Sequence, residues 1–126
     1  MSSTTQRPVH LNLLKIKLPI GGIMSIIHRA TGVFMFITLP YLIYLLGLSL
    51  DGPEGYAAAN QSVHSVFGTL FVFLLMWSLA HHLLAGIRYL LIDVDLGVEK
   101  EMARQSALAV TIAGPILGLL LTGGVL

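Results

Sequence analysis

Long apolar runs separated by short polar segments organise this chain. Uncharged stretches run over residues 30–50, 55–87 and 105–126. A helix rises about 1.5 Å per residue, and about 20 apolar residues cross the hydrocarbon core of a bilayer, so each stretch is long enough for one crossing. The middle stretch is longer than one crossing requires, and its polar beginning over 56–62 predicts a loop or an interfacial turn.

Two polar segments separate the expected spans. Asp51-Gly52-Pro53 is a good turn and helix breaker after the first span, and residues 93–104 connect the second span to the third. We therefore predict an all-α membrane protein with a cytoplasmic amino-terminal segment over 1–19 and a three-span membrane domain over 20–126. The predicted transmembrane helices cover about 22–50, 63–92 and 104–125.

The composition agrees with a membrane protein. The 126 residues are 56% hydrophobic and only 10% charged, with a mean hydropathy of +0.87. A soluble domain carries about 25% charged residues, so this surface faces mostly lipid or another protein. The chain has no cysteine, which excludes disulfides and thiolate-bound iron–sulfur clusters within it. A net charge of +1 gives no reason to expect a nucleic-acid partner, and the length leaves no room for a separate soluble catalytic domain.

The basic residues predict the orientation in the membrane. They all precede or open the first span, end the second span, or follow it, whereas the loop between the first two spans holds only Asp51 and Glu54 as charges. The basic residues are Arg7, Lys15, Lys17, Arg29, Arg88, Lys100 and Arg104. Under the positive-inside rule the amino terminus is cytoplasmic and the carboxyl terminus lies outside.

The segment Ser25-Ile-Ile-His28-Arg29-Ala-Thr-Gly32 places polar groups at the mouth of the first span. On a helix Ser25, Arg29 and Gly32 share one face, with His28 beside them. A charge at the centre of a bilayer costs roughly 2.5–3.5 kcal/mol on insertion scales, so this patch favours a site for a polar or anionic ligand. Two simpler interpretations stay open: the serine hydroxyl bonds its own helix, and Arg29 extends to the membrane surface as an anchor.

A second polar group lies deep in the middle span. His82 is eleven residues before Asp93, on the order of 16 Å from the inner boundary, and at 100° per residue it forms one stripe with Gly86, Tyr89 and Asp93. Neutral imidazole is a common axial ligand of haem iron, and a glycine one turn away leaves room for a flat macrocycle. Taken from the residues alone, interhelical hydrogen bonding, packing or proton relay would also explain the histidine.

Taken together, these motifs resemble the cytochrome b556 subunits of succinate dehydrogenase (complex II). The resemblance covers most of the chain, including the three-span layout. It is carried by Arg7-Pro-Val-His10-Leu11, by Ser25-Ile-Ile-His28-Arg29-Ala-Thr31-Gly32, and by His82-Leu-Leu-Ala-Gly86-Ile87-Arg88 with Asp93 after it. It implies that the three helices form half of a two-subunit anchor bundle.

The resemblance also implies roles for individual residues. His82 matches one axial ligand of haem b, the other ligand coming from the second anchor subunit. Ser25 and Arg29 match residues of the ubiquinone site near the inner surface, where a hydroxyl can donate to a quinone carbonyl and a guanidinium can stabilise negative charge. His28 and Arg29 match positions near the haem propionates, which cations would neutralise. Asp93 matches a possible proton-pathway residue.

One position departs from the family pattern. Some relatives have a histidine directly after the Gly-Ile-Arg motif, where this chain has Tyr89. A tyrosine can donate a hydrogen bond, but it cannot act as a cation toward a propionate. The resemblance therefore assigns no role to Tyr89.

The activity that the resemblance implies is electron transfer from succinate to ubiquinone, in the tricarboxylic acid cycle and the respiratory chain. The implied partners are a flavoprotein subunit with FAD, an iron–sulfur subunit and the second anchor, in a bacterial inner membrane with the carboxyl terminus periplasmic. This chain would be a non-flavin subunit and not catalytic alone. Two alternatives remain open: the anchor of a quinol:fumarate reductase, and a non-redox small transporter subunit in which His82 relays protons.

Overall fold

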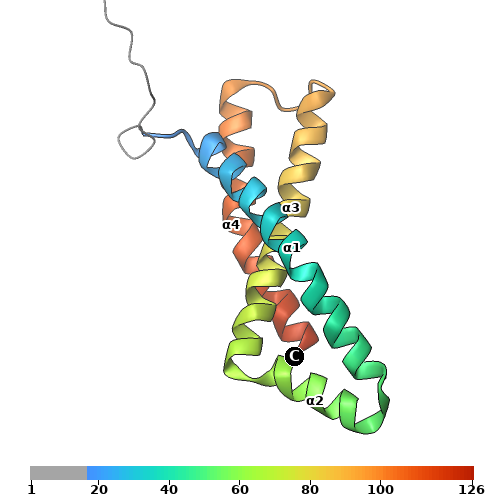
Figure 1. Cartoon of the computed structure of the whole chain (residues 1–126). Coiled ribbons are helices and arrows are strands. Elements are labelled where there is room, and N and C mark those ends of the chain that lie inside the picture. Colours follow the sequence, from blue (N-terminus) through green and yellow to red (C-terminus); the bar gives the residue numbers. More distant parts are fainter. Residues whose placement is uncertain (1–16) are drawn as a thin grey trace, which may run out of the picture.

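The computed structural model describes residues 17–126, and this part of the chain is helical throughout apart from short connections (Figure 1). The helices are α1 (Ile20–Leu50), α2 (Gly52–His64), α3 (Val66–Asp93) and α4 (Lys100–Val125). Three of them, α1, α3 and α4, are long and apolar enough to cross a membrane. The predicted all-α architecture with three spans is therefore confirmed, whereas Arg7, His10 and Lys15 lie outside the described residues.

The connections place the basic residues of this part of the chain toward one end of the molecule. The beginning of α1 and the loop between α3 and α4 lie at one end, and α2 and the carboxyl terminus lie at the other (Figure 1). The first end carries Lys17, Lys100 and Arg104 together with Asp93, Asp95, Glu99 and Glu101, whereas the second carries Asp51 and Glu54 and no lysine or arginine of residues 17–126. This is the distribution that the sequence predicted for a chain whose basic residues stay on one side.

The polar segment after the first span is a helix, so the predicted loop or interfacial turn over 56–62 is wrong. Gly52 adopts a φ of +82°, which favours glycine, and Pro53 lies in the first turn of α2, where its fixed φ suits a helix. The hydroxyl of Ser65 then accepts a hydrogen bond from the Gly68 N–H at 3.0 Å and caps α3. The long apolar stretch is thus divided at Ser65 into a short helix and a span.

Small residues bring α4 close to α3. A Cβ at Gly118 would lie 2.5–2.8 Å from the Cα, N and Cβ atoms of Trp77, and one at Gly114 would lie 3.0 Å from the Cβ and Nδ1 of His81. A methyl group has no room at position 118 and would press on His81 at position 114, so the two glycines allow this close approach of the helices. His81 is consequently only 1% exposed.

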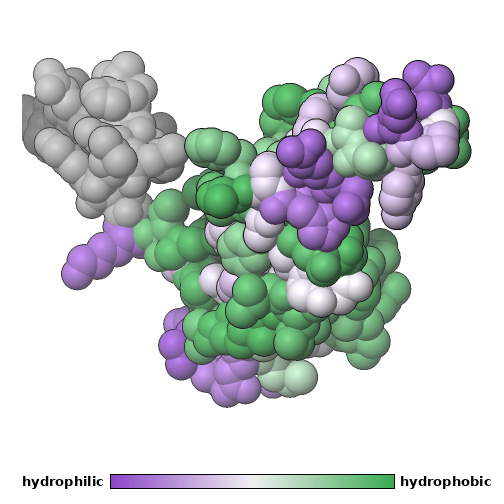
Figure 2. Space-filling view, turned by 90° about the horizontal axis from the view of Figure 1, so that it is seen from below, coloured by the Kyte–Doolittle hydropathy of each residue, from purple (hydrophilic) through white to green (hydrophobic). Residues whose placement is uncertain are grey.

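An apolar cluster joins the helices on the side of the loop between α3 and α4. Its members are Met24 of α1, Ala85 of α3, and Ala107 and Val110 of α4. Elsewhere the helices expose large apolar side chains, such as Phe36 at 75%, and hydrophobic surface covers much of the bundle seen from the α2 end (Figure 2). Contiguous apolar surface of this extent is typical of contact with lipid or a partner protein.

Candidate functional site

The imidazole of His82 lies directly against the backbone of α1 where that helix crosses α3. A Cβ at Gly32 would be 2.8 Å from His82 Cε1 and 3.3 Å from His82 Nδ1. Real side chains do not approach so closely, so a glycine at position 32 is what lets the ring occupy this place. Gly32 and His82, which the sequence placed in separate motifs, therefore belong to one site.

The tautomer of a neutral His82 imidazole follows from its hydrogen bond. Its Nδ1 lies 3.0 Å from the backbone carbonyl oxygen of His28. A carbonyl oxygen only accepts, so we assign the hydrogen to Nδ1, which leaves the lone pair of the neutral ring on Nε2. Nε2 has no hydrogen-bond partner within residues 17–126, and it is therefore free to bind a group from outside this part of the chain.

His28 lies flat against His82. The two ring centroids are 4.0 Å apart with an interplanar angle of 17°, and the Tyr89 ring lies 5.4 Å from the His28 ring at 57°. A Cβ at Gly86 would be 3.9 Å from His28 Nε2, an ordinary contact distance. Packing within the chain therefore does not require a glycine at position 86, and its missing side chain leaves space beside the histidine pair.

Ser25 and Arg29 lie one turn apart on α1 and are joined by a hydrogen bond to the backbone. The Arg29 Nε donates to the carbonyl oxygen of Ser25 at 3.4 Å, and the serine hydroxyl makes no hydrogen bond within the described part of the chain. Arg29 is exposed, and it lines an open surface hollow with Ile26, Ala30 and Val33, all from α1. No carboxylate of residues 17–126 lies within 4 Å of its guanidinium. Both side chains are thus available to a group outside this chain.

Asp93 is set apart from these residues. It is exposed at the last position of α3, toward the loop that joins α3 to α4. The structure therefore does not bring the carboxylate into the cluster around His82, although the same helix carries both residues.

Arg88 has a role that sequence reasoning did not find. Its Nε donates to the Ser106 hydroxyl and one terminal nitrogen donates to the Ala103 carbonyl oxygen, each at 2.9 Å. The guanidinium thereby joins α3 to the beginning of α4. Arg88 lies six positions after His82 and therefore on a different face of the helix. In the sequence, only this position indicated that Arg88 contacts something other than the His82 site.

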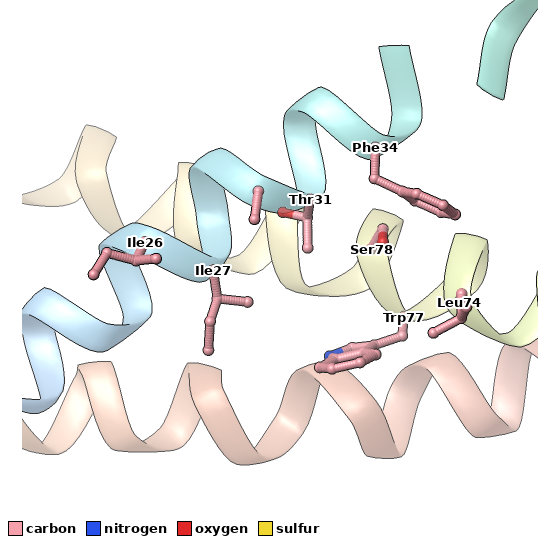
Figure 3. Close-up of a pocket in the computed structure, with 8 residues that line it drawn as sticks. Ile26, Ile27, Thr31, Phe34, Leu74, Trp77 and Ser78 are labelled. Atoms are coloured by element: carbon pink, nitrogen blue, oxygen red, sulfur yellow. The ribbon is translucent and has the colours of Figure 1, made fainter. Parts of the chain in front are cut away.

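A cavity of about 320 Å³ lies between α1 and α3, and Thr31 is among the residues that line it (Figure 3). Its walls are almost entirely apolar, and none of the predicted site residues lines it. The residues that enclose it include Ile27, Phe34, Leu74 and Trp77, and the indole Nε1 of the tryptophan is buried with no hydrogen-bond partner among residues 17–126. Sequence analysis did not predict this cavity.

The donors around His82 can be tested against the group that a b-type cytochrome carries. The described residues contain no group of three or more His, Cys, Asp or Glu side chains arranged to hold a metal ion. A single imidazole with a free Nε2 fits an iron whose equatorial ligands belong to a macrocycle. The space beside Gly86 and the hydrogen-bonded Nδ1 of His82 agree with that kind of ligation.

Comparison with known proteins gives one consistent result. Residues 3–121 match the family described as succinate dehydrogenase/fumarate reductase transmembrane subunit. The succinate dehydrogenase cytochrome b556 subunit of Paracoccus denitrificans is 34% identical over 116 residues, covering 92% of this chain and 88% of that protein. The cytochrome b556 subunit of Coxiella burnetii is 33% identical over 106 residues, covering 83% and 85%. The succinate dehydrogenase cytochrome b560 subunit of Reclinomonas americana is 32% identical over 100 residues, covering 75% and 69%.

Proposed function

The chain belongs to the family of succinate dehydrogenase/fumarate reductase transmembrane subunits, and from this premise we propose that it anchors a succinate:ubiquinone oxidoreductase and binds haem b within it. As a member of this family it is a membrane subunit of an oxidoreductase complex, which removes the transporter alternative. The similar proteins reported above are all named as succinate dehydrogenase subunits, which favours succinate oxidation over fumarate reduction.

We propose that His82 is one axial ligand of the haem iron. The observation that carries this assignment is the hydrogen bond from His82 Nδ1 to the His28 carbonyl, because it leaves the lone pair of the neutral imidazole on Nε2. The missing side chain at Gly86 supports it, since a macrocycle needs a flat space beside its ligand. When bound, haem supplies one-electron redox chemistry, and a second anchor subunit would supply the other axial ligand.

His28 and Arg29 are proposed to neutralise the haem propionates. His28 stacks on His82 at 4.0 Å, so a group bound at His82 Nε2 lies within reach of residues near this ring. Arg29 follows on the next position of α1, and its charge has no carboxylate partner within 17–126. A charge-assisted hydrogen bond from the Arg29 guanidinium to a propionate would compensate the positive charge of the arginine and the negative charge of the propionate.

Ser25 and Arg29 are also proposed to bind ubiquinone. The surface hollow beside Arg29 is lined by α1 alone, so partner subunits would have to supply its remaining walls. The unbonded Ser25 hydroxyl can donate to a quinone carbonyl, and the guanidinium favours negative charge on the ring. Asp93, exposed at the same end of the bundle, is proposed as a residue of the proton pathway.

The proposed setting is a bacterial inner membrane with the amino terminus cytoplasmic and the carboxyl terminus periplasmic. The end of the bundle that carries Lys17, Lys100 and Arg104 would then face the cytoplasm, in agreement with the positive-inside rule. The flavoprotein with FAD, the iron–sulfur subunit and the second anchor are the proposed partners. The flavoprotein and the iron–sulfur subunit would dock at that end and deliver electrons near Arg29.

The haem assignment is tested by dithionite-reduced minus oxidised spectra of the purified complex. We expect His82→Ala to abolish the b-type α-band, whereas His64→Ala should retain it. His64 is a matched control because it is exposed at the opposite end of the bundle, where its Nδ1 lies 2.9 Å from the Asn60 carbonyl oxygen. An unchanged α-band in an assembled His82→Ala complex would overturn the assignment.

A further inference from the structure

We propose that Thr31 is a positioning residue for His82, holding the imidazole in one tautomer and one orientation together with the carbonyl of His28. This inference rests on the proposed function of His82 as a haem ligand. It concerns a residue that would not touch the haem iron, and it assigns to the threonine hydroxyl of α1 a part in tuning that ligand.

Three polar atoms meet at the crossing of α1 and α3. Thr31 Oγ1 donates to the His28 carbonyl oxygen at 2.9 Å and lies 3.4 Å from His82 Nδ1. The same carbonyl oxygen accepts from His82 Nδ1 at 3.0 Å. Because a hydroxyl has one hydrogen and two lone pairs, Thr31 can donate to the carbonyl and still accept a share of the single Nδ1 hydrogen, which is then divided between the carbonyl oxygen at 3.0 Å and the hydroxyl at 3.4 Å.

The surroundings make this cluster difficult to rearrange. Thr31 is only 8% exposed, so its hydroxyl has little access to outside partners. The backbone of Gly32 supports the edge of the His82 ring, and His28 covers its face at a centroid distance of 4.0 Å. The ring is therefore held on two sides by α1, and the hydroxyl adds a second, longer contact to the nitrogen whose hydrogen the His28 carbonyl oxygen accepts.

A hydrogen bond to the distal nitrogen of a ligating histidine controls how strongly the other nitrogen donates electrons to iron. Thr31 shares the carbonyl on which this bond depends. Removing its hydroxyl changes the charge that the carbonyl presents to His82 Nδ1 and loosens the ring. Both effects alter the electronic state of a bound haem and its retention.

Thr38 offers a matched control on the same helix. It is also buried, at 7% exposure, and its hydroxyl also donates to the carbonyl three residues earlier, that of Met35, at 2.8 Å. The local backbone bond is thus common to both threonines. Only the hydroxyl of Thr31 additionally reaches His82 on another helix.

The experiment compares Thr31→Val, Thr31→Ser and Thr38→Val in the purified complex. Valine has the shape of threonine without the hydroxyl, whereas serine keeps the hydroxyl. We expect Thr31→Val to shift the low-spin EPR g values and the midpoint potential of the haem, and to weaken haem retention roughly tenfold. Thr31→Ser should restore the wild-type values, and Thr38→Val should leave them unchanged.

The outcomes separate this inference from the function on which it rests. Wild-type spectra and potential in Thr31→Val, or an equal shift in Thr38→Val, would overturn the positioning role. If His82→Ala removes the haem while Thr31→Val changes nothing, the ligand assignment stands and the positioning role fails. If His82→Ala retains the haem, the proposed ligation itself fails.

Discussion

Gly32 of α1 lies beneath the imidazole of His82 of α3, with 2.8 Å between a Cβ placed on the glycine and Cε1 of the ring. This relationship joins the polar patch at the entrance of the first span to the histidine in the middle of the second. It also explains why a glycine follows Thr31, since any side chain at that position would move the ring that presents Nε2.

Gly32→Ala is expected to displace His82 and weaken haem binding. Overpacking a well-packed contact costs about 1–3 kcal/mol, which corresponds to about fivefold to 150-fold weaker retention if it acts on the bound state. The haem content per purified complex measures the effect. Gly47→Ala on the same helix is the control, since a Cβ there meets nothing within 4 Å. Equal haem content in the two variants would contradict the packing argument.

Ser25→Ala and Arg29→Gln are expected to lower quinone reduction while preserving succinate oxidation with an artificial soluble acceptor. Hydrogen bonds to charged groups contribute about 1.5–3 kcal/mol, so Arg29→Gln should reduce kcat/KM for ubiquinone roughly tenfold to hundredfold. Ser49→Ala is the control, because that hydroxyl bonds the Leu46 carbonyl oxygen at 2.8 Å near the other end of α1. Parallel loss of both activities would indicate failed assembly and not a quinone site.

Gly118→Ala is expected to destabilise the bundle by separating α4 from α3. The new Cβ would lie 2.5 Å from Trp77 Cα and 2.7 Å from Trp77 N, and backbone atoms cannot move as freely as the end of a side chain. We expect a loss of about 1–3 kcal/mol, measured as a lower Tm of the purified complex. Gly123→Ala on the same helix meets nothing within 4 Å and should leave the Tm unchanged. Equal Tm values for the two variants would refute the close approach.

Arg88→Gln is expected to loosen the connection between α3 and α4. The arginine donates to Ser106 Oγ and to the Ala103 carbonyl oxygen, and charged hydrogen bonds of this kind contribute about 1.5–3 kcal/mol. Limited proteolysis in the loop over 94–99 should accelerate. Arg104→Gln is the comparison, because its exposed ion pair with Glu101 at 3.4 Å is screened by water and contributes little. Similar cleavage rates in both variants would show that Arg88 does not hold the two helices together.

Much of the architecture could be predicted from the order of apolar and polar residues. Three apolar stretches predicted three spans because the thickness of a bilayer sets the length of a helix that crosses it. The prediction was wrong for residues 56–62, where polarity suggested a loop. Polarity shows that a segment avoids the membrane interior, but it does not exclude a helix. The turn at Gly52 begins α2, and the cap at Ser65 separates α2 from α3.

The sequence by itself determined that His82 lies deep in the second span and that Ser25, His28 and Arg29 lie near the entrance of the first span, because position along a helix follows directly from residue number. Only the tertiary structure decided which atoms meet: the His28 carbonyl with His82 Nδ1, Gly32 with the imidazole, and the guanidinium of Arg88 with α4. These contacts join residues 15 to 54 positions apart. They depend on how each helix is rotated and where it crosses its neighbour, and side-chain packing between helices sets both.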